Sequence, residues 1–200
     1  MPSDTRDRIV QATAELFRRQ GYAATGLKQI LGEARAPSAS LYHFFPGGKE
    51  ELGIEVIATS GDFFQQLFAT IAAQAPDALS AMHEFFAGAA RTLEETDYED
   101  ACPIATVALE VASTNDALRQ ATAHVFDSWI AAGTRGLIAA GLPRERARQI
   151  TVHMIAALEG AFVLSRAARS PEPLLIAGDA LVAELAQALA QERAGARQPA

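Results

Sequence analysis

The sequence predicts an all-α protein. Alanine and other strong helix formers fill long stretches of its 200 residues. Apolar side chains recur with helical spacing, as Ile9, Ala12, Leu16 and Phe17 do, with Thr13 on the same face. No run of alternating β-branched residues is joined to another by a hairpin dipeptide, so no sheet is expected.

Three short helices are expected in the first 45 residues. They cover about residues 3–20, 25–33 and 38–44, with Gly21 ending the first and Thr25 capping the second. Two short helices that cross steeply and are braced by a third form a helix-turn-helix. The second helix of that motif enters the major groove of DNA.

The apolar residues of this segment divide it into an inner and an outer face. The residues expected to pack inward are Leu27, Ile30, Leu31, Ala34, Leu41 and Phe45. The residues left facing outward on the third helix are Ser38, Ala39, Ser40, Tyr42 and His43. The outward set is rich in hydroxyl groups, which donate hydrogen bonds to phosphates.

Longer helices follow the first three. They are expected over residues 49–74, 79–95, 104–113, 116–140, 144–169 and 174–193. An acidic loop at 96–103 and the Gly/Pro breaks at 141–143 and 170–173 separate them.

Charge is spread unevenly along the chain, whose formal net charge is -7. Residues 1–50 hold 7 Lys/Arg against 5 Asp/Glu, and residues 51–200 hold 10 against 19. An acidic body would repel phosphates and restrict nucleic-acid contact to the basic head.

The single cysteine, Cys102, fits a reducing compartment. With no apolar leader and no membrane span expected, a cytoplasmic protein is predicted.

Two motifs give the head a family resemblance. Residues 25–30 read TGLKQI and residues 40–52 read SLYHFFPGGKEEL, with Ala34 between them. Together they resemble the TetR family of transcriptional regulators. The glycine pair before Lys49, and ACPI at 101–104, are similar to its LmrA/YxaF-like branch. The resemblance implies a helix-turn-helix DNA-binding domain over 1–48 and a helical effector-binding and dimerisation domain over 49–200.

The resemblance also implies that the head binds a palindromic double-stranded DNA operator. The candidate DNA contacts are Thr25, Lys28, Arg35, Ser38, Ser40, Tyr42, His43 and Lys49. Carried over by position, Thr25, Tyr42 and Lys49 would contact phosphates. Hydroxyls, cations and helix N-terminal amides are the groups that hold phosphates.

Arg35, Ser38 and Ala39 are among the positions that depart from the family pattern. Arg35 stands where the turn usually has glycine, and a left-handed backbone there would cost about 1–2 kcal/mol. Ser38 and Ala39 stand where a basic residue and a glycine are common. These departures leave an alternative open, namely a helical small-molecule-binding protein whose head no longer binds DNA.

The last two long helices are apolar on more than one side. A helix of that kind in a small protein can offer one side to its own core and the other to a partner. We expect these helices from two copies to form a two-fold, four-helix interface in a homodimer. The candidate interface residues are Ala157, Gly160, Leu164, Leu181 and Leu185.

Aromatic residues gather in the middle of the chain. Apolar cavities with few polar anchors are typical small-molecule sites, and the resemblance implies a hydrophobic or aromatic effector that releases the DNA. The candidate lining residues are Phe63, Leu67, Phe86, Cys102, Phe126, Trp129 and His153. Ordinary core packing is the alternative for each.

Motifs of catalysis are missing from the sequence. It contains no HExxH, no ExxH pair, no GxSxG and no glycine-rich phosphate loop before a helix. No enzyme, metal or cofactor is therefore expected. The expected function is a ligand-responsive transcriptional regulator, in the simplest case a repressor.

Overall fold

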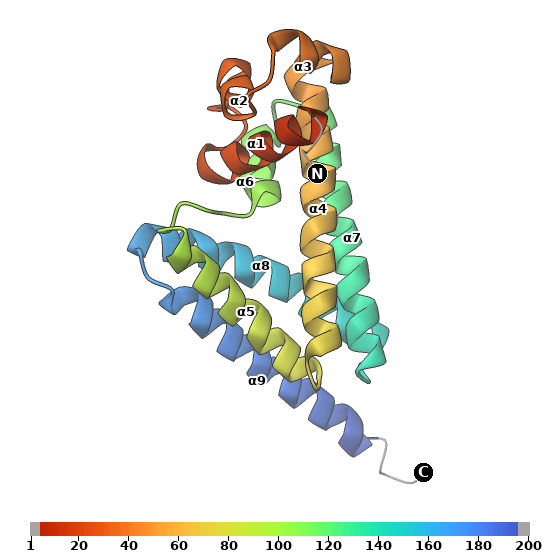
Figure 1. The fold of residues 1–200 in the computed structure, drawn as a ribbon. Coiled ribbons are helices and arrows are strands. Elements are labelled where there is room, and N and C mark those ends of the chain that lie inside the picture. The colour runs from red at the N-terminus through yellow and green to blue at the C-terminus, as the bar shows by residue number, and fades with distance from the viewer. Residues whose placement is uncertain (1–4, 196–200) are drawn as a thin grey trace. The chain divides into compact units, whose positions relative to one another are not determined.

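The computed structural model describes residues 5–195, and these contain nine α-helices and no strand (Figure 1). The helices are α1 (Thr5–Gln20), α2 (Leu27–Glu33), α3 (Ser38–Phe44), α4 (Gly48–Gln74), α5 (Ala78–Glu95), α6 (Pro103–Val111), α7 (Asp116–Ala139), α8 (Arg144–Ala168) and α9 (Glu172–Gly195). The all-α prediction is confirmed, and each expected helix is present with ends that differ by a few residues.

The helices belong to two compact units. Within the described residues, the head unit contains residues 5–64 together with Asp100–Phe126, and the body unit contains Gln65–Glu99 and residues 127–195. α4 and α7 each run from one unit into the other. The predicted domain boundary between residues 48 and 49 falls at the start of α4 and stays a functional hypothesis.

The core of the head unit begins with the apolar stripe of α1. Its five members are buried as expected, and Ile9 and Phe17 are completely so. Thr13 is tolerated there because its hydroxyl donates to the Ile9 carbonyl at 2.7 Å. The other large side chains of this core are Ile30, Leu41, Leu52, Ile57, Ile104 and Leu118. α6 and the first half of α7 therefore fold together with the three short helices.

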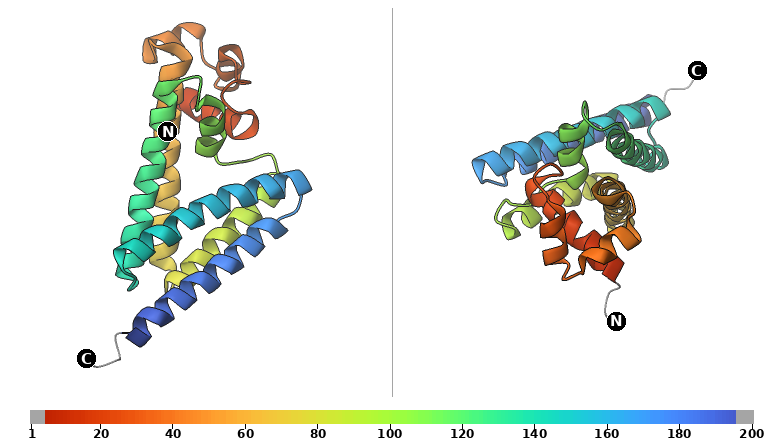
Figure 2. Two further views of the ribbon diagram at one scale, coloured as in Figure 1. Left: turned by 180° about the vertical axis from the view of Figure 1, so that it is seen from behind. Right: turned by 90° about the horizontal axis from the view of Figure 1, so that it is seen from above.

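Two glycines let α4 and α7 approach closely inside the head unit. A Cβ on Gly53 would lie 3.1 Å from the Leu118 side chain, and one on Gly61 would lie 2.7 Å from Val125. The head-unit parts of the two helices run side by side in both views (Figures 1 and 2). Larger residues at either glycine would push the two helices apart.

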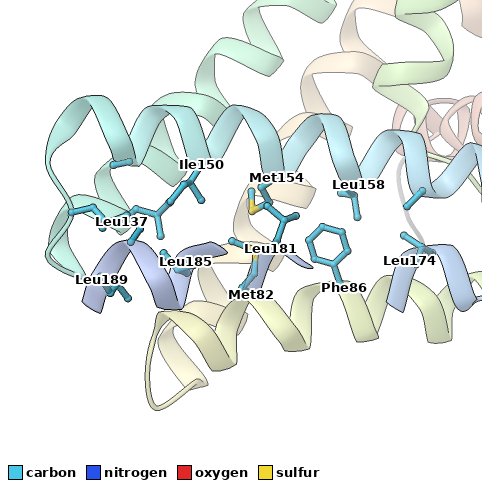
Figure 3. Close-up of a cluster of buried hydrophobic side chains, with 14 of the residues drawn as sticks. Met82, Phe86, Leu137, Ile150, Met154, Leu158, Leu174, Leu181, Leu185 and Leu189 are labelled. Atoms are coloured by element: carbon cyan, nitrogen blue, oxygen red, sulfur yellow. The ribbon is translucent and has the colours of Figure 1, made fainter. Parts of the chain in front are cut away.

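The body unit is built on α5, α8 and α9, with the end of α7 against them (Figure 3). Phe86 of α5, Met154 of α8 and Leu181 of α9 meet in its core. Gly178 allows α9 to approach α5, because a Cβ there would lie 2.7 Å from Phe86 Cβ. One side of α8 faces this core, and its buried members include Ala147, Met154, Leu158 and Ala161.

Leu181 and Leu185 require a correction. Both were predicted to lie in a dimer interface, but both are 0% exposed and pack with α5 and α8 in the chain's own core. Helical periodicity located the apolar stripe of α9 correctly without telling which neighbour covers it.

α8 and α9 also carry apolar side chains on their outer surfaces. Val163, Leu164 and Ile176 are each about 60% exposed, at 61%, 61% and 60%. By length and composition alone, these two helices of the described chain are long and apolar enough to cross a membrane. Helices that cover their own core on one side and a partner on the other meet the same criterion.

The loop after α5 is held by the end of α8. Arg166 donates to the carbonyls of Tyr98 and Glu99 at 3.2 and 3.1 Å. Arg169 pairs with the Asp97 carboxylate and lies over the Tyr98 ring. Asp97 and Tyr98 both have positive φ, so these arginine contacts stabilise a backbone that non-glycine residues rarely adopt.

Candidate nucleic-acid interface

The outer face of α3 is open to solvent, as the sequence predicted. Leu41 and Phe45 fix the helix from below, at 0% and 2% exposed. Ser38 and His43 are exposed, Tyr42 is 60% exposed, and Ser40 is half-buried. A short helix anchored on one side and polar on the other has the form that a major groove accepts.

Two cations flank this helix. Lys28 of α2 and Arg35 of the α2–α3 turn are exposed, and neither has an ion-pair partner within residues 5–195. A shallow groove brings Lys28, Ser38 and Tyr42 together over an apolar floor that includes Leu31. Unpaired cations beside hydroxyl groups are suited to phosphate oxygens.

Arg35 is left-handed, with φ of 48°. The Ala36 N–H donates to the Leu31 carbonyl at 3.0 Å and the Arg35 N–H to that of Gly32 at 3.2 Å. This pair of bonds is the Schellman ending of α2, in which glycine usually occupies the position of Arg35. The condition of the prediction, a left-handed backbone at Arg35, is therefore met.

Thr25 does not take the position that the sequence analysis gave it. Its side chain is 0% exposed, and its hydroxyl donates to the Gly21 carbonyl at 2.6 Å. The N-cap of α2 is Gly26, one residue later. A buried hydroxyl that is already bonded cannot reach a phosphate, so Thr25 stabilises the α1–α2 turn instead.

Lys49 lies over an aromatic ring. Its Nζ is 4.1 Å from the centroid of Tyr22, which packs edge-on against Phe17 at 5.6 Å. Burial lowers the pKa of Lys49, and the Glu110 carboxylate acts in the opposite direction. Burial raises the pKa of Tyr22, with a smaller contribution from the Glu50 charge. Cation–π contact therefore supplies an intrachain reason for a lysine at a helix N-terminus, and its phosphate contact stays a prediction.

The arginines of α1 brace the head unit. Arg6 pairs with Glu55 of α4 at 2.7 Å, and the Arg8 Nε donates to the Ala34 carbonyl at 3.1 Å. Arg18 pairs with Asp100 at 3.1 Å. The sequence gives no local sign of these contacts, because each partner is at least 26 residues away along the chain.

The seven candidate effector residues are divided between the two units. Phe63, Cys102 and Phe126 belong to the head unit, and the other four to the body unit. Phe63 is 60% exposed, while Phe126 and Trp129 are half-buried. Cys102 is buried and caps α6, its sulfur accepting from the Ala105 N–H at 3.5 Å.

Two of those seven residues are not placed as expected. Phe86 is 1% exposed and belongs to the core of the body unit. His153 is on the surface, where its Nδ1 lies 2.6 Å from a Glu184 carboxylate oxygen that α9 supplies. Helical spacing placed Phe86 and His153 on helices, but it could not show whether each side chain faces a cavity, the core or the solvent.

The described residues contain no group of three or more His, Cys, Asp and Glu side chains placed to hold a metal ion.

Comparison with known proteins identifies the family. A family model described as bacterial regulatory proteins of the tetR family matches residues 9–56. A second, described as the C-terminal domain of LmrA/YxaF-like transcriptional regulators, matches residues 78–180. The chain belongs to the TetR family. Its membership makes it a DNA-binding transcriptional regulator with a helix-turn-helix head.

Two TetR-family relatives come from Bacillus subtilis. The uncharacterized HTH-type transcriptional regulator YxaF is 36% identical over 86% of this chain and 91% of its own length. The HTH-type transcriptional regulator LmrA is 31% identical over 86% and 92%. A solved regulatory protein TetR from Rhodobacter sphaeroides shares the fold, with a TM-score of 0.80 at 22% identity over 90% of this chain and 98% of that one.

Proposed function

We propose that this TetR-family regulator is a repressor that binds a palindromic operator as a homodimer and releases it when a small hydrophobic or aromatic effector binds. The observation that carries the proposal is the exposed face of α3, with the two exposed cations Lys28 and Arg35 beside it. It would act in the cytoplasm, by regulation and not by catalysis.

The DNA contacts that we propose are the predicted ones without Thr25. Ser38, Tyr42 and His43 face outward on α3, and Lys28 lies at the same groove as the first two. These groups are better suited to contacts with phosphates than to base-specific contacts. We therefore expect them mainly to fix the register and orientation of the protein on the duplex. Affinity should accordingly fall steeply with salt.

The homodimer is supported by the outer faces of α8 and α9. Leu164 of α8 and Ile176 of α9 are large apolar side chains at 61% and 60% exposure, and Leu175 adds 44%. Gly160 is exposed, and a Cβ built there would meet nothing within 4 Å. Small residues between large apolar ones let two helices pack closely. We therefore keep Ala157, Gly160 and Leu164 as interface residues.

Repression is the simplest consequence of the proposed dimer occupying a promoter. Two heads of a two-fold dimer cover half-sites one or more helical turns apart, and a promoter so occupied is closed to other proteins. For the effector, the half-buried aromatic side chains Phe126 and Trp129 offer the apolar contact area that such ligands need.

The test is selection of bound sequences from a random duplex pool by the full-length protein, followed by a salt titration on the selected duplex. We expect an enriched palindrome whose binding constant falls with salt by a slope of about 0.9 per phosphate contact. A pool that shows no enrichment at low salt would support the alternative of a ligand-binding protein with a degenerate head.

Tyr42→Phe tests the placement of α3. Removing the hydroxyl should weaken operator binding by about 2- to 10-fold, the usual value of one hydrogen bond. The fold should be unaffected because the ring is 60% exposed. Binding is measured by fluorescence anisotropy, with Tyr98→Phe as a control in the body unit. Equal affinities for wild type and Tyr42→Phe would remove Tyr42 from the interface.

Effector action is tested with a panel of small aromatic compounds. A true effector should raise the melting temperature by mass action and weaken operator binding by the same linkage. A compound that stabilises the protein but leaves operator affinity unchanged would contradict the proposed coupling.

A further inference from the structure

Glu110 of α6 is bonded to the turn between α1 and α2. Its Oε2 accepts the backbone N–H of Ala23 at 2.8 Å. The carboxylate occupies the space where a side chain at position 21 would lie, so a Cβ on Gly21 would collide with it. Gly21 also has φ of 80°, a backbone conformation that favours glycine.

That turn sets the start of α2. The Thr25 hydroxyl donates to the Gly21 carbonyl at 2.6 Å, which closes the turn. The Gln20 side chain then bridges to Gln29 of α2 at 2.9 Å. A shift of the turn would therefore move α2, which carries the exposed cation Lys28.

The same turn also determines where Lys49 lies. Tyr22 in the turn provides the ring that the Lys49 ammonium covers at 4.1 Å. A Cβ on Gly53 of α4 would be 3.2 Å from that ring, so the ring fits tightly against α4. Glu110 further interacts with Lys49 through its charge.

We propose that Glu110 is a positioning residue for DNA binding: it holds the α1–α2 turn, and with it Lys28 and Lys49, in the arrangement that contacts phosphates. The inference rests on the proposed function and deepens it. Glu110 lies within the range that matches the C-terminal family model, outside the range of the DNA-binding one.

The sign of the expected effect separates positioning from simple electrostatics. Removing an acidic residue from a surface near DNA reduces repulsion of phosphates and should tighten binding. If Glu110 positions the turn, its removal should weaken binding instead.

The experiment compares wild type, Glu110→Ala, Glu110→Gln and Glu33→Gln on the selected operator. Glu33 is an exposed acidic residue of α2 and controls for charge. Glu110→Ala should bind roughly 10-fold or more weakly, as expected for loss of a hydrogen bond to a charged group. Glu110→Gln should recover most of the affinity, because its amide oxygen can still accept from Ala23. Glu33→Gln should bind as tightly as wild type or more tightly.

Hydrogen exchange of the Ala23 amide gives a readout that needs no DNA. Exchange should be faster in Glu110→Ala and close to wild type in Glu110→Gln, with melting temperatures used to exclude global unfolding. If wild type binds the operator and Glu110→Ala binds equally or more tightly, the positioning role is refuted while the proposed function stands. If wild type selects no operator, the proposed function fails. Unchanged Ala23 exchange in Glu110→Ala would show that the hydrogen bond from Ala23 to Glu110 does not hold the turn.

Discussion

Single residues with left-handed backbone mark where the chain departs from the easiest conformation. Arg35, Asp97 and Arg169 each end or follow a helix with φ near 50°, at 48°, 50° and 49°. Asp97 and Arg169 bind each other in the body unit, which offsets their conformational cost. Arg35 has no such partner within the described chain. We propose that a contact between its guanidinium group and a DNA phosphate offsets the conformational cost at this residue.

Arg35→Gly should separate stability from binding. Glycine relieves the left-handed strain, so the free energy of unfolding should rise by up to about 1 kcal/mol after glycine's own entropic cost. Loss of the cation should weaken operator binding and make the salt slope shallower by about 0.9. Urea unfolding and anisotropy measure the two effects. Unweakened operator binding would show that Arg35 makes no phosphate contact.

Asp77 is a second residue with a defined energetic role. Its carboxylate caps α5 by accepting the Ser80 N–H at 2.8 Å, and that bond lowers the pKa of Asp77 from its usual 3.8. A carboxyl group whose pKa is lower in the folded state stabilises the fold above its unfolded pKa. This stabilisation is lost as the pH falls below 3.8 through the folded value.

Asp77→Ala should therefore lower the melting temperature at pH 7, and the difference from wild type should shrink as the pH is lowered through the carboxyl range. Differential scanning calorimetry across this range measures it, with the exposed Asp179→Ala as control. A difference that stays constant down to the acid limit would show that the cap does not depend on charge.

At the level of helices, packing depends on a few glycines at close approaches. Gly178 lies where α9 meets α5, and the core side chain of Phe86 fills the space beside it. Gly136 of α7 is exposed, and a Cβ there would meet nothing within 4 Å. The two positions therefore form a matched pair.

Gly178→Ala should destabilise the protein by roughly 1–3 kcal/mol through overpacking. Gly136→Ala should be neutral or stabilising by up to about 1 kcal/mol, since alanine favours helix. Chemical unfolding of both variants measures this. Equal stability of the two would mean that α5 and α9 can move apart at little cost.

For the whole molecule, we propose that the outer faces of α8 and α9 form the dimer interface. Gly160→Leu places a large side chain where the chain itself leaves open space. The monomer should keep its fold, while the proposed dimer should weaken because the helices can no longer approach. Analytical ultracentrifugation measures the mass, with Gly136→Leu as control. A variant that sediments as an unchanged dimer would exclude this face.

Sequence patterns predicted the helices because helical periodicity is local information. The five buried residues of α1 and the inward stripe of α8 follow directly from it. The exposed side of α3 followed from the same reasoning, with Leu41 and Phe45 as the buried anchors. The family resemblance rested on contiguous motifs and is confirmed by the matching family models.

What the sequence could not show depends on partners distant along the chain. Thr25 was predicted to be an exposed helix cap, but its hydroxyl donates a hydrogen bond to the Gly21 carbonyl inside the turn. Leu181 looked like an interface residue, but α5 covers it. Glu110 could not be singled out from the sequence, because acidic residues are common on amphipathic helices. Its role depends on the hydrogen bond from the Ala23 N–H, which only the structure shows.

The head unit is discontinuous in sequence, and this limits how such regulators can be recombined. A chimera that joins the first 56 residues to another protein's effector domain would leave behind Glu110, Leu118 and Val125, which complete the head from α6 and α7. A graft that also carries residues 100–126 would keep these contacts. The N-terminal segment and residues 100–126 must therefore be exchanged together, and a chimera that receives both should acquire the operator specificity of this protein.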